Sequence, residues 1–137
     1  MGASSRKNGS IRPGNHFAIF RIIELMNHDL RDIFKALGSD VRLQMLYWLK
    51  DPARHFPEPV AERDSYAGPL PPVPPDAGVC VGYLQRKAGI SPSTASAHLA
   101  VLQRAGLIEA TRVGQWTYYR RNEARIAELA RAIELHL

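Results

Sequence analysis

The chain has 137 residues, 45% of them apolar, which is enough to build one domain with its own core. Its net charge of +5 favours a polyanionic partner. A single cysteine excludes an intramolecular disulfide and suits the reducing cytoplasm. No apolar run approaches the roughly 20 residues of a membrane span, so we expect a cytoplasmic protein without a membrane contact.

The N-terminal residues divide into a tail and an apolar helix. Residues 1–14 are small, polar and basic, and this composition predicts a disordered tail before a domain that spans residues 15–137. From His16 to about Met26 nearly the whole helical circumference is apolar, so this helix has to be buried, either on its own domain or on a second subunit. We favour the second subunit, with dimerisation residues Phe17, Phe20 and Ile23.

Two further helices are expected between Leu30 and Pro52, which lies just past the end of the second. The first contains the apolar residues of Leu30 to Leu37 and ends at Gly38, and Ser39 is a suitable cap for the second. Four residues of the second helix are expected to face the core: Leu43, Leu46, Tyr47 and Leu49.

The segment 51–78 has an unusual composition. It holds eight of the ten prolines and carries a net charge of −3. Because proline-rich chain stays extended, we predict no helix in this segment. It is either disordered or an arm that packs on a partner subunit through Phe56, Tyr66 and Leu70.

From Val81 the chain reads as two short helices joined by a tight turn. Gly89 suits the left-handed end of the first helix, and Ser91 can cap the second, with Pro92 at its first position. The second helix ends at Gly106. Its inward face is predicted by the helical spacing of Ala95, Leu99 and Leu102. This is the pattern of a helix-turn-helix, whose second helix enters the DNA major groove.

Two strands are expected after the second helix. Ile108–Arg112 and Trp116–Arg120 are rich in β-branched and aromatic residues and flank Gly114-Gln115, a two-residue hairpin connection. The predicted fold is therefore mostly α with a small β-hairpin wing, a winged helix-turn-helix. Side chains alternate along the second strand, and one of two pairs is expected in the core: Trp116 with Tyr118, or Thr117 with Tyr119.

A last helix is expected after Asn122, which can cap it. An apolar stripe runs along its whole length and is followed by no further element, so it requires a partner surface. The dimerisation residues expected here are Ile126, Leu129, Ile133 and Leu137, with Ala130 in the same stripe.

Three blocks of this sequence resemble the ArsR/SmtB-type winged-helix repressors of bacteria. The blocks read FKALGSDVRLQML (Phe34–Leu46), GISPSTASAHLAVLQRAGLIE (Gly89–Glu109) and GQWTYYR (Gly114–Arg120). The resemblance covers roughly Leu30 to Leu137 and is absent before about Asn27. It is weak between residues 51 and 78, where it implies a proline-rich insertion, because the family usually has only a few residues at this connection. It implies a transcriptional regulator that binds double-stranded DNA sequence-specifically, as a homodimeric repressor on a pseudo-palindromic operator.

The charge distribution and the helical wheel give candidate DNA contacts. Between Arg86 and Arg121 there are six basic residues and one acid, so this stretch carries a net charge of +5, equal to that of the whole chain. We expect small residues of the second helix to lie nearest the bases and basic residues to contact phosphates. The candidates are Ser91, Ser93, Thr94, Ser96, Ala97, Arg86, Lys87, Arg104, Arg112, Gln115 and Arg120.

The first turns of this helix lack the Arg, Lys, Asn and Gln side chains that read bases most strongly, so we expect specificity to depend on DNA shape and on the wing. His98 is interpreted as a packed residue at the flank of the helix rather than as a base reader.

No metal or cofactor is predicted. The resemblance implies metal sites built from a cysteine pair or from ligands on the last helix. Cys80 has Gly82 in place of the second cysteine, and Arg125 replaces a histidine ligand between Glu123 and His136. Cys80 is either a small buried apolar residue or a redox-responsive thiol. The sequence is compatible with an inducer, either a small molecule or a redox change, but identifies none.

Two other classes of function compete with binding to double-stranded DNA. No phosphate-binding loop, nucleophile elbow or carboxylate cluster favours an enzyme. A winged-helix module that binds RNA or protein is an alternative, because Trp116, Tyr118 and Tyr119 could stack single-stranded bases. A preference for duplex over single-stranded nucleic acid would separate the two readings.

Overall fold

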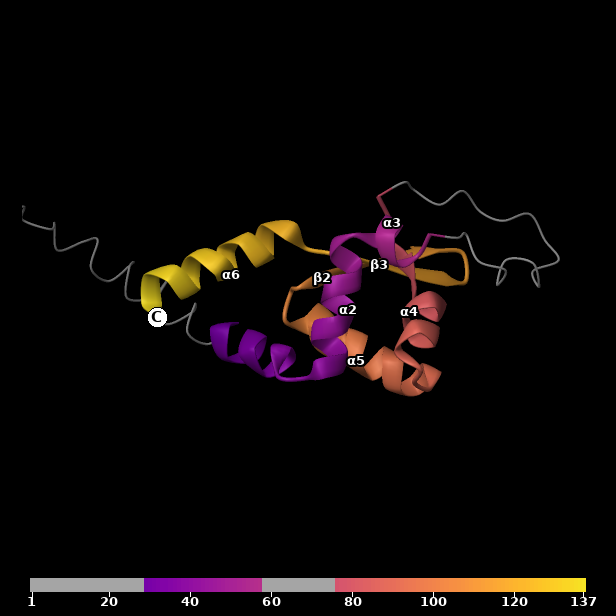
Figure 1. The fold of residues 1–137 in the computed structure, drawn as a ribbon, viewed down its shortest axis with the longest axis horizontal. Coiled ribbons are helices and arrows are strands. Elements are labelled where there is room, and N and C mark those ends of the chain that lie inside the picture. The colour runs from indigo at the N-terminus through magenta and orange to yellow at the C-terminus, as the bar shows by residue number, and fades with distance from the viewer. Residues whose placement is uncertain (1–28, 58–75) are drawn as a thin grey trace, which may run out of the picture.

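The computed structural model describes residues 29–57 and 76–137 (Figure 1). The predicted tail, the helix with Phe17, Phe20 and Ile23, and the insertion residues Tyr66 and Leu70 lie outside the described residues. Residues 29–37 are helical. The elements that follow are α2 (Asp40–Lys50), α3 (Pro52–His55), β1 (Val79–Cys80), α4 (Val81–Ala88), α5 (Pro92–Arg104), β2 (Ile108–Val113), β3 (Trp116–Arg121) and α6 (Glu123–His136).

The strands form a three-stranded antiparallel sheet in the order β1-β3-β2. The hairpin of β2 and β3 turns at Gly114-Gln115, and each strand is one residue longer than predicted. The sequence did not predict β1, which pairs Val79 with Tyr119 and Cys80 with Tyr118. The predicted fold, mostly helical with a small hairpin wing, is confirmed.

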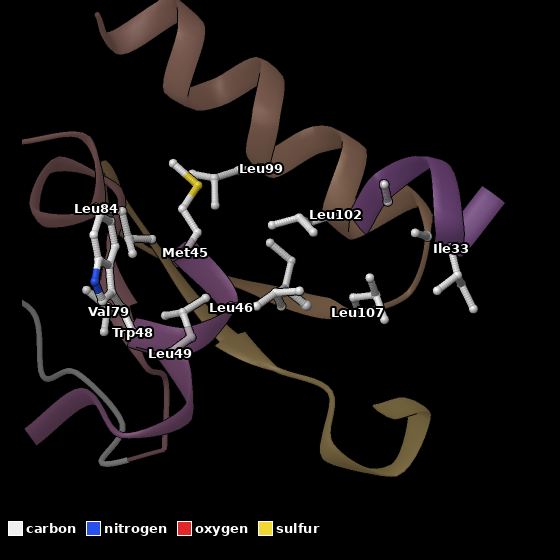
Figure 2. Packing of buried hydrophobic residues seen from close by; sticks show 13 residues of the cluster. Ile33, Met45, Leu46, Trp48, Leu49, Val79, Leu84, Leu99, Leu102 and Leu107 are labelled. Atoms are coloured by element: carbon white, nitrogen blue, oxygen red, sulfur yellow. The ribbon is translucent and has the colours of Figure 1, made fainter. Parts of the chain in front are cut away.

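The core lies where α2 packs between α5 and the sheet. Met45, Leu84, Leu99 and Leu102 are fully buried, and they come from three different helices. Figure 2 shows the Met45 side chain pointing from α2 toward Leu99 of α5. Burial of these side chains contributes about 25 cal/mol for each Å² of apolar surface removed from water, so it fixes α5 against the rest of the domain.

The expected inward face of α2 was partly wrong. Leu46 and Leu49 are buried as predicted, but the exposed fractions of Leu43 and Tyr47 are 48% and 52%. Met45 and Trp48 occupy the core instead. Apolar residues cover most of the circumference of α2, and its outward side is marked only by the exposed polar pair Asp40 and Gln44, which Tyr47 and Leu43 border.

The prediction of an extended chain was wrong for the first residues of the insertion. Pro52 begins a one-turn helix, where its missing N–H is not needed, and the Asp51 carboxylate caps it by accepting from the Arg54 N–H at 3.4 Å. Phe56 then packs edge-on against Trp48 of the same chain, with ring centroids 6.4 Å apart. This end of the insertion is therefore part of the domain.

The helical segment 29–37 and α6 lie at the same end of the molecule, away from α4 and the hairpin (Figure 1). Arg125 of α6 forms an ion pair with Asp29 at 3.1 Å across these two helices. Asn122 caps α6 as predicted, accepting from the Arg125 N–H. None of the helices in residues 29–57 and 76–137 has the length and apolarity needed to cross a membrane.

Candidate nucleic-acid interface

The turn between α4 and α5 has the predicted geometry. Gly89 adopts a left-handed conformation with φ of 65° and ends α4. The Gln85 side-chain amide donates to the Ile90 carbonyl at 3.1 Å and holds the turn. Ser91 then caps α5 by accepting from the Thr94 N–H at 3.2 Å. Together these contacts make a rigid helix-turn-helix.

The α5 helix has a core side and an outward side of small residues. Ala95, Leu99 and Leu102 are fully buried, as their spacing predicted. Until its last turn, the outward side consists of exposed residues with short side chains: Ser93, Thr94, Ser96, Ala97 and Ala100. The beginning and middle of this helix can therefore approach another molecule closely, and the exposed Arg104 lies on the same side at its end.

Hydroxyl groups cluster at the start of α5. The Ser91 Oγ lies 2.8 Å from the Thr94 Oγ1 and 3.2 Å from the Ser93 Oγ. Because Ser91 also caps the helix, its hydroxyl is largely occupied within the protein. Ser93 and Thr94 therefore present the more available hydroxyls of this cluster.

The tip of the hairpin carries an exposed cation. Arg112 is on β2 next to the turn, and its Nε donates to the Gly114 carbonyl at 3.3 Å. Gly114 has φ of 61°, which a two-residue hairpin turn favours, and the neighbouring Gln115 is exposed. The Arg112 guanidinium thus keeps most of its donors for a partner.

Arg120 has a different environment from Arg112, although both were predicted to contact DNA. Its guanidinium lies 2.7 Å from the Glu109 carboxylate of β2 and 3.3 Å from that of Asp76. Two carboxylates therefore neutralise it at the base of the hairpin. The sequence gives no signal for Asp76, because nothing local places it beside a residue 44 positions later.

The two basic residues of α4 lie over aromatic rings. The Lys87 ammonium is 5.4 Å from the ring centre of Trp48 and 5.5 Å from that of Phe56. The Arg86 guanidinium is 5.7 Å from the ring centre of Tyr83. Both side chains are nevertheless exposed, as is Arg104 at the end of α5. They keep positive charge on the surface while their stems cover apolar groups.

Both faces of β3 are packed. Tyr118 is buried in a small cluster with Ala77 and Cys80, with Trp116 against it. Tyr119 on the other face packs against the main core, and its burial raises the pKa of its hydroxyl above 10.0. The prediction that only one face of this strand enters the core was therefore wrong, because side chains on both faces are packed. The aromatic rings of Tyr118 and Tyr119 serve packing.

Cys80 and the acidic residues do not form a metal site in the described chain. Cys80 is buried and belongs to β1. Glu123 forms an ion pair with Arg121 at 2.9 Å, and Arg125 is paired with Asp29. Across residues 29–57 and 76–137, no group of three or more His, Cys, Asp or Glu side chains is positioned to hold a metal ion.

The helical segment 29–37 and α6 carry an exposed apolar surface. Ile126 and Leu129 pack partly against the core of their own chain. Further along α6, Ile133 is exposed, as are Leu135 at 70% and Leu137 at 89%. Leu135 lies outside the predicted stripe, so its spacing gave no signal.

Two apolar grooves, of about 260 and 330 Å³, run between these helices, and Phe34 borders the second. The two helices that carry this apolar surface lie at the end of the molecule away from the wing (Figure 1).

Comparison with known proteins matches this arrangement. Residues 79–110, which include the helix-turn-helix, match the family model described as bacterial regulatory protein, arsR family. Over 100 residues the chain is 43% identical to YbzH of Bacillus subtilis, an uncharacterised HTH-type transcriptional regulator, covering 72% of this chain and 89% of YbzH.

Solved structures share the fold. An ArsR-like transcriptional regulator from Rhodococcus sp. RHA1 superposes with a TM-score of 0.54 at 23% identity. The match covers 80% of this chain and 79% of the Rhodococcus protein. A homodimeric winged helix-turn-helix DNA-binding domain from Mycobacterium bovis superposes with a TM-score of 0.53 at 26% identity. The match covers 84% of this chain and 83% of the Mycobacterium domain.

Proposed function

This chain belongs to the ArsR family of bacterial regulatory proteins and is a DNA-binding transcriptional regulator. We propose that it is a homodimeric repressor of a pseudo-palindromic operator. The observation that supports this proposal most strongly is the division of α5 into a buried face and an exposed face of small side chains. That face is the part of a helix-turn-helix that enters the major groove.

In this proposal Ser93, Thr94, Ser96 and Ala97 lie nearest the bases. Hydroxyl groups can donate to or accept from several base edges, and the alanine methyl can contact a thymine methyl. Such contacts discriminate weakly between bases, so part of the specificity comes from the shape and deformability of the DNA.

Basic residues around α5 supply the phosphate contacts. Arg112 at the hairpin tip reaches the minor groove of the DNA or its phosphates. Arg86, Lys87 and Arg104 contact the phosphate backbone of the DNA. Phosphate contacts hold the protein in register without reading sequence. Arg120 is left out of this set, because Glu109 and Asp76 already neutralise its charge.

The dimer is proposed to form through α6 and the helical segment 29–37. Their exposed apolar residues include Phe34, Ile133, Leu135 and Leu137, and the related domain from Mycobacterium bovis is a homodimer. A two-fold axis at this end would place two α5 helices in major grooves about one helical turn, roughly 34 Å, apart. The assignment as a repressor comes from the resemblance to ArsR/SmtB-type repressors.

Selection of bound duplexes from a randomised library tests this proposal. We expect enrichment of an inverted repeat whose half-sites are separated by about 10 base pairs from centre to centre. Enriched duplexes should bind far more tightly than either of their separated strands. Enrichment of an asymmetric site, or of single strands, would contradict the proposal and favour the RNA-binding alternative.

A further inference from the structure

Arg42 connects three helices through one side chain. It lies in the first turn of α2, where its backbone N–H donates to the Ser39 hydroxyl at 3.4 Å. Its guanidinium reaches back to the end of the helical segment 29–37 and donates to the Ala36 carbonyl and, at 3.2 Å, to the Lys35 carbonyl. A third nitrogen, Nη1, lies 3.1 Å from Nδ1 of His98 in α5.

The chemistry of these contacts suits arginine and neutral histidine. The carbonyls at the end of a helix lack partners within the helix and carry partial negative charge, so a cation there is favourable. A guanidinium has five N–H donors in a fixed plane and accepts nothing. His98 Nδ1 must therefore be the acceptor of the Arg42 bond, which places the ring proton on Nε2.

His98 is well placed to control the orientation of α5. It lies between Ala97, which is exposed on the outward side, and Leu99, which is fully buried. The Arg42 bond thus acts on the flank of the helix, where it resists rotation about the helix axis. The buried residues on the core side also hold α5 in the domain, so we expect the protein to fold without this bond.

We propose that Arg42 and His98 are positioning residues for DNA recognition, because their hydrogen bond sets the angle at which α5 presents its outward face. This inference rests on the operator binding proposed above. The same contact links α5 to the helical segment 29–37, which is joined to α6 by the Asp29–Arg125 ion pair.

A double-mutant cycle on operator affinity tests this inference. The variants are Arg42→Met, His98→Leu and the combination, measured with a duplex enriched by selection. We expect each single change to weaken binding about tenfold, and the combination to weaken it no more than either alone, because both remove the same bond. Arg54→Met removes a positive charge from an exposed residue of α3 and should weaken binding less than about threefold.

His98→Asn separates positioning from simple loss of packing. An asparagine side-chain oxygen can accept where Nδ1 does, so this variant should restore affinity to within about threefold of wild type. Equal weakening by His98→Asn and His98→Leu, or additive effects of Arg42→Met and His98→Leu, would overturn the inference.

If Arg42→Met fails to fold, the His98 variants still decide, because they leave the capping of the helical segment intact. A wild-type protein without sequence preference would overturn the proposed function together with this inference. Wild-type preference with unchanged affinity in the His98 variants would overturn the inference alone.

Discussion

Gly78 lies so close to Tyr119 that a β-carbon built on the glycine would come within 2.0 Å of the Tyr119 carbonyl oxygen. Gly78 also has φ of 97°, a conformation that residues with a side chain rarely adopt. It immediately precedes β1, so this close approach is where the returning end of the insertion joins the sheet.

Replacing Gly78 with alanine should destabilise the protein by at least about 3 kcal/mol, because the methyl group forces β1 away from β3. Gly89→Ala is the matched control, since Gly89 also has positive φ but has open space around its β-carbon position. The control should lose only about 1 kcal/mol. Urea unfolding measures both, and equal losses would show that the contact with Tyr119 has no effect.

Acidic residues on the outward face of α5 should abolish specific binding. Ser93→Glu with Ser96→Glu places two carboxylates against the DNA, and we expect the operator affinity to fall at least about 100-fold. The control is Gln44→Glu with Ala53→Glu, which adds the same charge at exposed positions on α2 and α3. Anisotropy titration of both double variants is the measurement, and retained affinity in the α5 variant would remove this helix from the interface.

Arg112 and Arg120 should differ in their effect on the salt dependence of binding. Arg112→Ala removes the proposed phosphate contact, so the slope of log affinity against log salt should fall by about 1. Arg120→Ala removes a charge already paired with Glu109 and Asp76, so the slope should stay the same while stability decreases. Titrations at several salt concentrations give both slopes, and the opposite ranking would place Arg120 at the DNA.

The apolar end of α6 should hold the dimer together. Ile133→Glu with Leu137→Glu would bury carboxylates in the interface, so we expect the dimer dissociation constant to rise at least about 100-fold. Leu43→Glu alters an exposed apolar residue on α2 and should leave the dimer intact. Sedimentation velocity distinguishes the two, and a surviving dimer in the α6 variant would move the interface elsewhere.

Local signals in the sequence were sufficient for the helix-turn-helix. The conformational freedom of Gly89, the capping hydroxyl of Ser91 and the spacing of Ala95, Leu99 and Leu102 act within a few residues, and all five have the predicted roles. The inward face of α2 is harder to predict, because apolar residues cover most of the helix and only the polar pair Asp40 and Gln44 marks the side opposite Met45 and Trp48.

Long-range pairing explains the other differences. The two residues of β1 are too few to show a pattern, and they are a strand only because β3 lies beside them. Neither the Asp76–Arg120 ion pair nor the Arg42–His98 bond leaves a trace in local spacing, since each joins residues more than 40 positions apart. The exposure of the small residues of α5 followed from the helical wheel, whereas the partners of Arg120 and His98 did not.

The most direct measurement is fluorescence anisotropy with a duplex from the upstream region of the gene and a scrambled duplex of the same composition, at several salt concentrations. A sequence-specific regulator should bind the native duplex at least about 1,000-fold more tightly. Both affinities should fall as salt rises, because phosphate contacts release counterions. Equal binding to the two duplexes with the same salt slope would contradict the proposed operator recognition.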